Sequence, residues 1–471
     1  DEYLNSSSRE ETIKANKKFV PYNKGGLYRK WYGNNDCVVY FKDFGKAIAQ
    51  SYGSRFQNSA LYLIESISWS KISSGNIAFR YKPYGHVFDV AGCSIFGDHD
   101  RLITLLGIVN SNVIQTILRA LAPTLNYEVG QISNLPIIYP SNDSIKDLSS
   151  KNIELSKQEW DRYEESWDFL KHPLIVKYDS LKQAYFALEE STNNEFNEMK
   201  RNEELINKIV AKEYGLEHEV DFTVDEKNVS IRKIEITSCI KSLISYALGV
   251  SFGRYSLDVD GLAYAGGDWD STLYSTIIPD ENNIIPLMDE GYFEDDALNK
   301  IVTFVEKVYG KDTLDENLKF IADALGGSGT SREVIRNYLL NGFYSDHTKI
   351  YQKRPIYWLF DSGKHNGFKA LIYMHRYTPD LLAKMRTDYI LPLMDKYSLR
   401  IEYLTNEIPS LSGIAQSKAK KELEKVNAQL KELSAYEPKI HHLADERITI
   451  DLDDGVKHNY ELFKDVLSPI K

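Results

Sequence analysis

Cysteine is scarce in this sequence. The 471 residues include only Cys37, Cys93 and Cys239, which lie far apart and form no Cys-x-x-Cys pair. This usage argues against a disulfide framework or a structural zinc and favours a reducing compartment, so we expect a cytoplasmic protein. Long apolar runs are also missing, since none approaches the roughly 20 residues of a membrane span. We therefore expect no membrane partner.

Recognised ligand-binding motifs are scarce too. Gly326-Gly-Ser-Gly-Thr330 lacks the Lys-Ser/Thr of a phosphate-binding loop and is better suited to ending a helix at Leu325. Asp225-Glu-Lys227 matches half of a nuclease motif, and Asp98-His-Asp100 has the ligand types of a divalent-ion site. Such combinations are frequent by chance in a chain that is 27% charged. His441-His442 lacks partners at ligand spacing, and we predict no metal site.

Basic residues are outnumbered overall but not in every region. The chain carries 57 Lys and Arg against 68 Asp and Glu, a net charge of −11 at pH 7. Residues 1–150 hold 16 basic and 13 acidic residues, whereas the remainder holds 41 and 55. A basic front on an acidic body can orient a polyanion onto one end of a molecule. The negative total therefore does not exclude nucleic acid as a partner.

A basic and aromatic stretch lies near the N-terminus. Residues 14–35 contain six Lys or Arg, no Asp or Glu, and four Tyr or Trp. Cations attract phosphate regardless of sequence, and aromatic faces stack on bases. Gly25, Gly26 and Gly33 allow close backbone approach or a positive φ. The alternative is an exposed loop that enters a domain with its aromatic side chains packed beneath it.

Short β-type runs separated by polar turns follow this stretch. The expected strands cover residues 37–41, 60–64, 67–69, 77–80 and 87–91. Next to one of them, Arg80, Lys82, Tyr84 and His86 occupy alternate positions and would share one face of a strand. Arg and Lys pair with guanine or phosphate, so this face could contact DNA. The alternative is an ordinary exposed strand face, which Pro83 interrupts locally.

The rest of the chain is predicted to be mainly helical. Apolar spacing predicts one amphipathic helix over residues 102–121, which Pro123 ends. Helical segments are also expected within residues 156–216, 231–250 and 332–340, with a buried aromatic strand or helix pair at 353–360 and 368–377.

Two further amphipathic runs suggest a helical hairpin near the C-terminus. They cover residues 382–408 and 423–433 and are joined by a Ser-Gly turn, so they predict an antiparallel pair in which Pro392 kinks the first helix. We expect proteases to cut first near residues 141–155 or 409–416.

Several separated motifs resemble one family. Phe19–Asn34 is similar to the junction that leads into the target-recognition region of the PglX family, the adenine-specific DNA methyltransferases of BREX phage-defence systems. Trp69-Ser-Lys71 and Phe88–Phe96 resemble target-recognition domains of this class. Residues 105–137 resemble the distal end of target-recognition domains in type I specificity subunits and fused methyltransferases. Other segments similar to the PglX family are Ser166–Leu174, Asp258–Asp270, Arg354–Trp358, Phe368–Tyr377 and His442–Lys457. The resemblance covers nearly the whole chain.

The resemblance implies a function. It indicates the C-terminal target-recognition and scaffold portion of an adenine-N6 methyltransferase, with double-stranded DNA as substrate and a flipped adenine. It also implies a partner methyltransferase domain upstream of Asp1, in agreement with a chain that does not begin with Met, and S-adenosylmethionine as cofactor of the full-length protein. This class needs a Gly-rich loop and an Asn/Asp-Pro-Pro-Tyr/Phe loop, but the chain has no Pro-Pro. We expect the fragment to hold no catalytic residue and no cofactor and to be inactive alone.

The expected fold class is α+β, an α/β target-recognition lobe followed by a mostly α-helical body with a C-terminal helical hairpin. The expected domains are a linker at 1–18, the recognition domain at 19–145, a mainly helical middle domain at 146–378, and the hairpin and C-terminal segment at 379–471. The expected DNA-binding residues are Lys24, Arg29, Lys30, Trp31, Asn34, Lys71, Arg80, Lys82, Tyr84 and His86.

Two other functions stay open. One is the recognition half of a fused type II restriction–modification methyltransferase, which the sequence upstream of Asp1 would distinguish because a nuclease domain would lie there. The other is a non-catalytic adaptor that binds other defence proteins through the acidic helical body. Binding that is independent of salt and of DNA would favour the adaptor.

Overall fold

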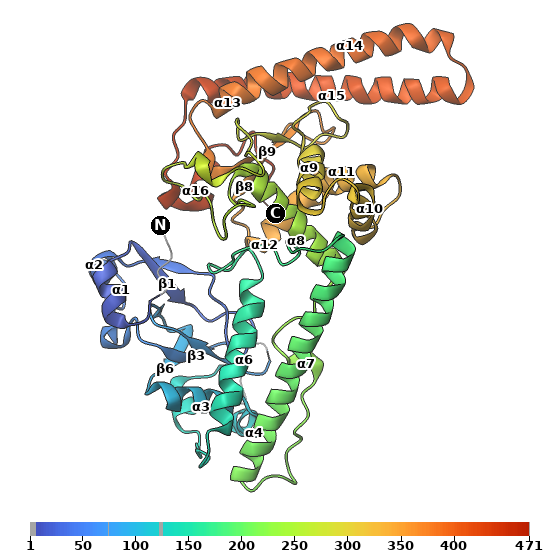
Figure 1. Ribbon diagram of the computed structural model, residues 1–471. Helices are drawn as coiled ribbons and strands as arrows, with labels where there is room; N and C mark the ends of the chain where they lie inside the picture. The colour runs from blue at the N-terminus through green and yellow to red at the C-terminus, as the bar shows by residue number, and fades with distance from the viewer. Residues whose placement is uncertain (1–5, 74, 122–125, 471) are drawn as a thin grey trace. The chain divides into compact units, whose positions relative to one another are not determined.

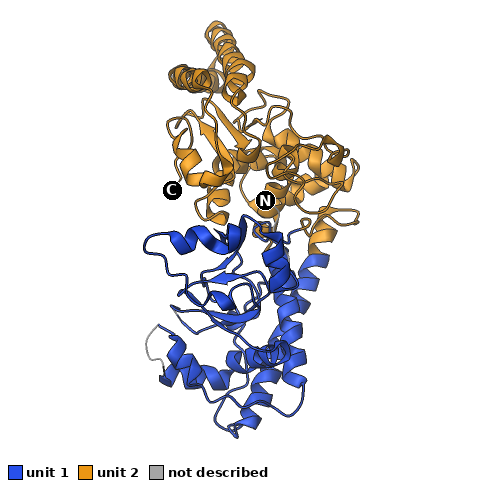
Figure 2. Ribbon diagram, turned by 90° about the vertical axis from the view of Figure 1, so that its left-hand side faces the viewer, with its two compact units in different colours: residues 1–169, 187–234 blue, residues 170–186, 235–471 orange. Residues whose placement is uncertain are grey.

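The computed structural model describes residues 6–73, 75–121 and 126–470. About 52% of the chain is helical and the sheets are small, which confirms the α+β class with a helical body. The chain forms two compact units (Figure 2), unit 1 with residues 1–169 and 187–234 and unit 2 with residues 170–186 and 235–471. This division cuts the chain at other positions than the expected domains, and one boundary falls inside helix α7 (Leu181–Glu213).

Unit 1 begins with a β-rich part built on two small sheets (Figure 1). One sheet has the order β2-β1-β5, with β1 antiparallel to β2 and parallel to β5, and the other is the antiparallel sheet β4-β3-β6. The elements are α1 (Arg9–Ala15), β1 (Phe19–Asn23), β2 (Val38–Tyr40), α2 (Lys42–Gln50), η1 (Ser59–Leu61), β3 (Ser66–Ser70), β4 (Phe79–Lys82), β5 (Val87–Phe88) and β6 (Gly92–Ile95).

One expected strand of unit 1 is wrong. Residues 60–64 form the short 3-10 helix η1 and a turn, because Leu63 has a φ of 66°, which a strand does not accommodate. The apolar side chains that suggested a strand are nevertheless used, since Tyr62 and Leu63 lie in a small core with Val20, Phe41 and Val87. The apolar pattern therefore predicted correctly that these side chains are buried, but it predicted a strand where the backbone forms a 3-10 helix and a turn.

The later helices of unit 1 share a hydrophobic core with the β3 sheet. They are α3 (His99–Asn110), α4 (Asn112–Leu121), α5 (Val129–Ser133), α6 (Ser144–Asp161) and most of α7, with the 3-10 turn η2 (Glu226–Asn228) after α7. Their core includes Trp69 and Phe79 of the sheet together with Leu106 of α3 and Ile206 of α7. Because residues 144–161 form a helix, most of the segment expected to be cut as a linker is folded.

The single helix expected over residues 102–121 is two helices. α3 and α4 meet at Ser111, whose backbone is extended, and are bent by 70°. The break is fixed by side chains, since Ser111 Oγ donates to the carbonyl of Ile108, and Asn110 forms two hydrogen bonds with the backbone of Phe79 in β4. The proposed stop at Pro123 lies outside the described residues.

Unit 2 surrounds the antiparallel sheet β7-β9-β8. Its strands are β7 (Ile285–Pro286), β8 (Tyr357–Asp361) and β9 (Lys369–Tyr373), so the aromatic pair expected at 353–377 is a strand pair. The helices before and between the strands are α8 (Ile236–Phe252), η3 (Ser271–Leu273), α9 (Ala297–Tyr309), α10 (Leu314–Leu325), α11 (Ser331–Asn341) and α12 (Phe343–Ile350).

The glycine-rich segment between α10 and α11 confirms its interpretation as a helix end. α10 stops at Leu325, and Gly326 follows with a φ of 73°. Thr330 then caps α11, with its side chain accepting from the backbone N–H of Glu333 while the Glu333 carboxylate accepts from the Thr330 N–H. The segment thus ends one helix and starts the next.

The predicted C-terminal hairpin is present. After η4 (Met374–Arg376) and α13 (Leu381–Lys384), α14 (Leu391–Glu407) and α15 (Gly413–Glu446) run side by side and are joined through η6 (Ile408–Ser410) (Figure 1). Pro392 lies in the first turn of α14, directly after the π-helical η5 (Met385–Ile390), where a missing backbone N–H is tolerated. The chain ends with η7 (Leu452–Asp454) and α16 (Gly455–Glu461).

No single helix in the described part of the chain combines the length and apolar content that a membrane crossing needs. Within the described ranges, α3 and α4 taken together as a bent pair meet those criteria, and most of their apolar residues lie in the core of unit 1.

Candidate nucleic-acid interface

The basic stretch is held in place by acids from two helices of unit 1. Arg29 Nη2 forms an ion pair with Glu159 Oε2 of α6 at 2.7 Å, and Lys30 Nζ pairs with Glu203 of α7. Trp31 Nε1 donates to the other oxygen of Glu203 at 2.6 Å. All five side chains are buried, so these cations are neutralised inside unit 1.

Electrostatics favour the charged form of this network. Burial by itself would raise the pKa of Glu159, but the charges and hydrogen bonds of Arg29 and Arg232 outweigh it and hold the pKa below its ordinary value. Burial by itself would lower the pKa of Lys30, and the neighbouring Glu203 raises it above its ordinary value. Both shifts favour the charged forms of Glu159 and Lys30.

Gly33 allows the basic stretch to fold back against the side chain of its own Arg29. Its φ is 123°, and a Cβ at this position would collide with the Arg29 side chain and approach Trp160 Cε3 to 2.8 Å. The Arg29 guanidinium also lies over the Trp160 ring, 4.9 Å from its centroid. A residue with a side chain at position 33 would displace Arg29 from Glu159.

The expectation that Arg80, Lys82, Tyr84 and His86 share an exposed strand face is wrong. Arg80, Lys82 and His86 are 0%, 1% and 4% exposed. The outer edge of β4 is covered by the basic stretch, because Trp31 N donates to the carbonyl of Phe79 at 3.0 Å and Tyr81 N donates to the carbonyl of Trp31 at 2.7 Å. Pro83 follows the end of β4, so Tyr84 and His86 lie outside the strand.

The two buried cations of β4 bind backbone oxygens of the stretch. Arg80 Nη1 donates to the carbonyl of Arg29 at 3.2 Å, and Lys82 Nζ donates to the carbonyls of Gly33 and Asn34 at 2.9 and 3.0 Å. Burial, with the charge of Arg29, lowers the pKa of Arg80 to about 10, and burial with the charge of Arg80 lowers the pKa of Lys82. These side chains fix the shape of the stretch, and we no longer assign them to base recognition.

The remaining expected residues lie at or near the surface. Lys24 is exposed, with its ammonium over the Tyr22 ring, and Tyr84 is half-buried. Asn34 is half-buried and donates to the carbonyl of Leu27 at 2.9 Å, while Lys71 pairs with Glu128 at 3.1 Å.

Three loops meet beside Lys24 and form what we call the loop edge, residues 24–28, 71–72 and 89–91. Ser70 Oγ donates to the carbonyl of Gly26 at 2.9 Å, and Lys71 N donates to the carbonyl of Ala91 at 3.0 Å, so backbone contacts hold the loops together. Their tips carry exposed apolar side chains, since Leu27, Ile72 and Val90 are 85%, 69% and 75% exposed. The edge thus combines apolar tips with cations.

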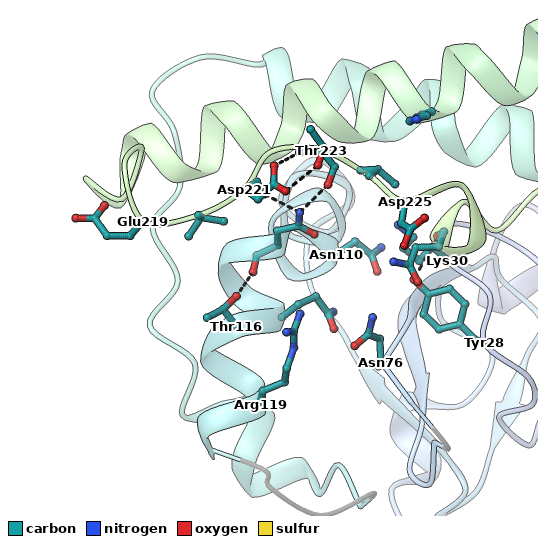
Figure 3. Close-up of a pocket in the computed structure, with 16 residues that line it drawn as sticks. Tyr28, Lys30, Asn76, Asn110, Thr116, Arg119, Glu219, Asp221, Thr223 and Asp225 are labelled. Atoms are coloured by element: carbon teal, nitrogen blue, oxygen red, sulfur yellow. Dashed lines mark hydrogen bonds between the residues drawn. The ribbon is translucent and has the colours of Figure 1, made fainter.

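A polar cleft of about 600 Å³ opens next to the loop edge. Figure 3 shows Tyr28 and Lys30 on one side, Thr116 and Arg119 of α4 on another, and Asp221 and Thr223 of the loop after α7 above them. Five carboxamides line it, Asn76, Asn110, Asn112, Gln115 and Asn228. Tyr28 belongs both to the loop edge and to the lining of the cleft.

The walls of the cleft are fixed by hydrogen bonds. Asn112 Nδ2 donates to the carbonyl of Asp221 at 2.8 Å, which ties α4 to the loop after α7, and Gln115 Nε2 donates to the carbonyl of Val109. Arg119 and Lys200 form no ion pair, and the Asn76 and Asn228 side chains form no hydrogen bond, with any of the described residues. These four side chains are available to a ligand.

The cleft residues were missed because they come from segments far apart in the sequence. Asn76, Arg119, Lys200 and Asn228 have no common motif, and only folding brings them together. A cluster of unpaired polar side chains at one opening is a signal that only a three-dimensional structure provides.

The metal-type residues from the sequence have structural partners. Lys227 Nζ pairs with Asp225 at 2.7 Å, Asp98 caps the N-terminus of α3, and His99 pairs with Glu65. Within the described ranges, no three His, Cys, Asp or Glu side chains are grouped as a metal site would require.

Comparison with known proteins places the chain in a family. No known protein-family profile matches it. The adenine-specific methyltransferase PglX of Lacticaseibacillus casei (strain Zhang) is 39% identical over 481 residues, which cover 98% of this chain and 40% of PglX. The adenine-specific methyltransferase BrxX of Escherichia coli O9:H4 (strain HS) is 34% identical over 490 residues, which cover 97% of this chain and 40% of BrxX.

The chain therefore spans about two fifths of the length of the curated relatives that it matches, as expected for the C-terminal portion of such a protein. It belongs, over nearly its whole length, to the family of PglX-like adenine-specific methyltransferases.

Proposed function

We propose that this chain is the DNA-recognition and scaffold portion of a site-specific DNA adenine-N6 methyltransferase of a BREX phage-defence system, acting in the cytoplasm. The observation that carries the proposal is the match of 97–98% of the chain to two adenine-specific methyltransferases. The chain also lacks the Pro-Pro loop of amino methyltransferases, so we assign the chemistry to the part of the protein outside it.

Unit 1 is the proposed DNA-binding unit. The loop edge carries Lys24 and Lys71 together with exposed apolar tips, and cations on a surface attract duplex DNA through its phosphates. Apolar side chains at loop tips are used by DNA-binding proteins to enter base steps. We therefore assign initial contact with duplex DNA to the loop edge rather than to the buried cations of the basic stretch.

S-adenosylmethionine is assigned to the upstream methyltransferase domain of the same polypeptide. The residues that line the cleft of unit 1 include no glycine, so the cleft has no Gly-rich backbone turn of the kind that this class uses for the cofactor. The proposed task of the residues that line the cleft is to bind and orient DNA.

The proposal is tested by titrating the chain with a labelled duplex at two salt concentrations and recording fluorescence anisotropy. We expect binding that weakens as salt rises, because phosphate contacts release counterions. A chain that ignores duplex DNA but binds other defence proteins independently of salt would support the adaptor function and overturn the proposal.

A further inference from the structure

We propose that the cleft of unit 1 reads base edges of duplex DNA, with Asn76 and Arg119 as specificity-determining residues. This inference rests on the proposed function and assigns recognition to residues outside every motif of the sequence. The cleft lies within unit 1, and its volume of about 600 Å³ leaves room for base edges presented at its opening.

The lining has the hydrogen-bonding character of base recognition. Carboxamides offer one acceptor and two donors in a plane and pair bidentately with adenine, whereas guanidinium groups pair bidentately with guanine. Asn76 and Asn228 supply free carboxamides and Arg119 supplies a free guanidinium, with no partner among the described residues. The lining also includes the cations Lys30, Arg119 and Lys200, but five carboxamides accompany them, which phosphate binding alone would not require.

The acidic side of the cleft strengthens the assignment to bases. Glu219, Asp221 and Asp225 line the segment after α7, and their carboxylates repel a phosphate backbone. Carboxylates do accept hydrogen bonds from exocyclic amino groups of bases. Tyr28 belongs to the loop edge and also lines the cleft, so a duplex that contacts both would have its phosphates at the loop edge and its base edges at the cleft.

The walls of the cleft are held by hydrogen bonds, and this supports specific recognition of bases rather than non-specific contact with DNA. Asn110 is locked onto β4, and Asn112 ties α4 to the loop after α7. Arg119 therefore projects from a fixed helix, and in Figure 3 it extends from α4 toward the middle of the cleft. Free side chains on a fixed frame lose less entropy on binding and discriminate better between bases.

The test uses the full-length methyltransferase that contains this chain. Arg119→Ala and Asn76→Ala are compared with Arg201→Ala, which removes an exposed cation of α7 outside the cleft. Affinities for the cognate and a scrambled duplex are measured by anisotropy at two salt concentrations, and methylated adenines are mapped by sequencing. Circular dichroism establishes that each variant is folded.

We expect Arg119→Ala to weaken binding to the cognate duplex by about 5- to 100-fold and to change binding to the scrambled duplex by less than about 3-fold. Asn76→Ala should relax the methylated motif at one base position. Arg201→Ala should bind both duplexes within about 2-fold of the parent, because it removes at most one phosphate contact.

Contrary outcomes separate the two proposals. If both cleft variants bind the cognate duplex and methylate the same motif as the parent, the cleft assignment fails while the proposed function stands. Equal weakening of both duplexes by Arg119→Ala would make Arg119 a phosphate contact and also overturn it. Micromolar binding of free dAMP that depends on Arg119, with unchanged discrimination between duplexes, would mark a nucleotide site instead. If the unmutated protein binds the cognate and the scrambled duplex equally well, the proposed function itself is wrong.

Discussion

At the scale of single residues, Glu159 and Glu203 determine how the basic stretch behaves. Each acid is buried and pairs with a cation that would otherwise be free to meet a polyanion. Their role is structural, because the ion pairs fasten the stretch to α6 and α7, and Trp31 completes the contact through its indole N–H. The loop edge is thereby held in one geometry.

Glu203→Gln should destabilise unit 1 by about 3 kcal/mol, because it leaves the buried Lys30 ammonium without its counter-charge. The measurement is urea unfolding followed by tryptophan fluorescence. Glu190→Gln removes an exposed acid from the same helix and should stay within about 0.5 kcal/mol of the parent. Equal stability of the two variants would show that the Lys30 pair contributes nothing.

The stability of unit 1 should fall in acid because of Glu159. The pKa of its carboxyl is lower in the folded state than the ordinary 4.5, so its contribution is fully present above that value and is lost as pH falls through the folded pKa. Urea unfolding between pH 6 and 3 measures this loss, and Glu159→Gln should make the dependence shallower. A variant with the same slope as the parent would exclude Glu159 as the origin.

Residue roles were the least predictable feature of the sequence. The acids that neutralise Arg29 and Lys30 lie 130 and 173 residues further along the chain. No local sequence pattern therefore predicts that these two cations are buried. Alternation correctly placed Arg80 and Lys82 on one face, but it could not show that the basic stretch covers that face. The exposed Lys24 follows from its own residue type, and its contact with DNA stays a prediction.

At the scale of elements, local signals were reliable where the local sequence decides the backbone. The end of α10, the cap of α11 and the hairpin of α14 and α15 follow from glycine, capping residues and apolar spacing. The division at Ser111 was missed because Asn110 forms its hydrogen bonds with β4 rather than within the helix. The spacing of apolar residues predicts which face of a helix is buried, but it does not show where the helix bends.

In the hairpin, substitution of a packed side chain should cost more unfolding free energy than substitution of an exposed one. Leu433 of α15 is 0% exposed within the core of unit 2, and Leu433→Ala should cost about 2–5 kcal/mol of unfolding free energy. Leu399 of α14 is 66% exposed, and Leu399→Ala should cost less than about 0.5 kcal/mol. Denaturant unfolding of both variants checks this, and comparable losses would contradict the packing described for the hairpin.

At the scale of the whole molecule, the proposed function makes the chain one part of a larger enzyme whose chemistry lies outside it. Calorimetric titration of the isolated chain with S-adenosylmethionine should give no binding heat, because neither the Gly-rich loop nor the Pro-Pro loop is present. Binding at micromolar concentration or tighter would show that the chain carries a cofactor site of its own, and the division of labour proposed above would be wrong.

The most direct test exchanges this portion between two full-length methyltransferases of the family that modify different sites. Each hybrid keeps its own upstream region and receives the segment equivalent to residues 1–471 from the other protein, and its methylated adenines are mapped by sequencing. If the chain provides DNA recognition, the methylated motif follows the donor of the exchanged segment. A motif that stays with the upstream region in an active hybrid would contradict the account.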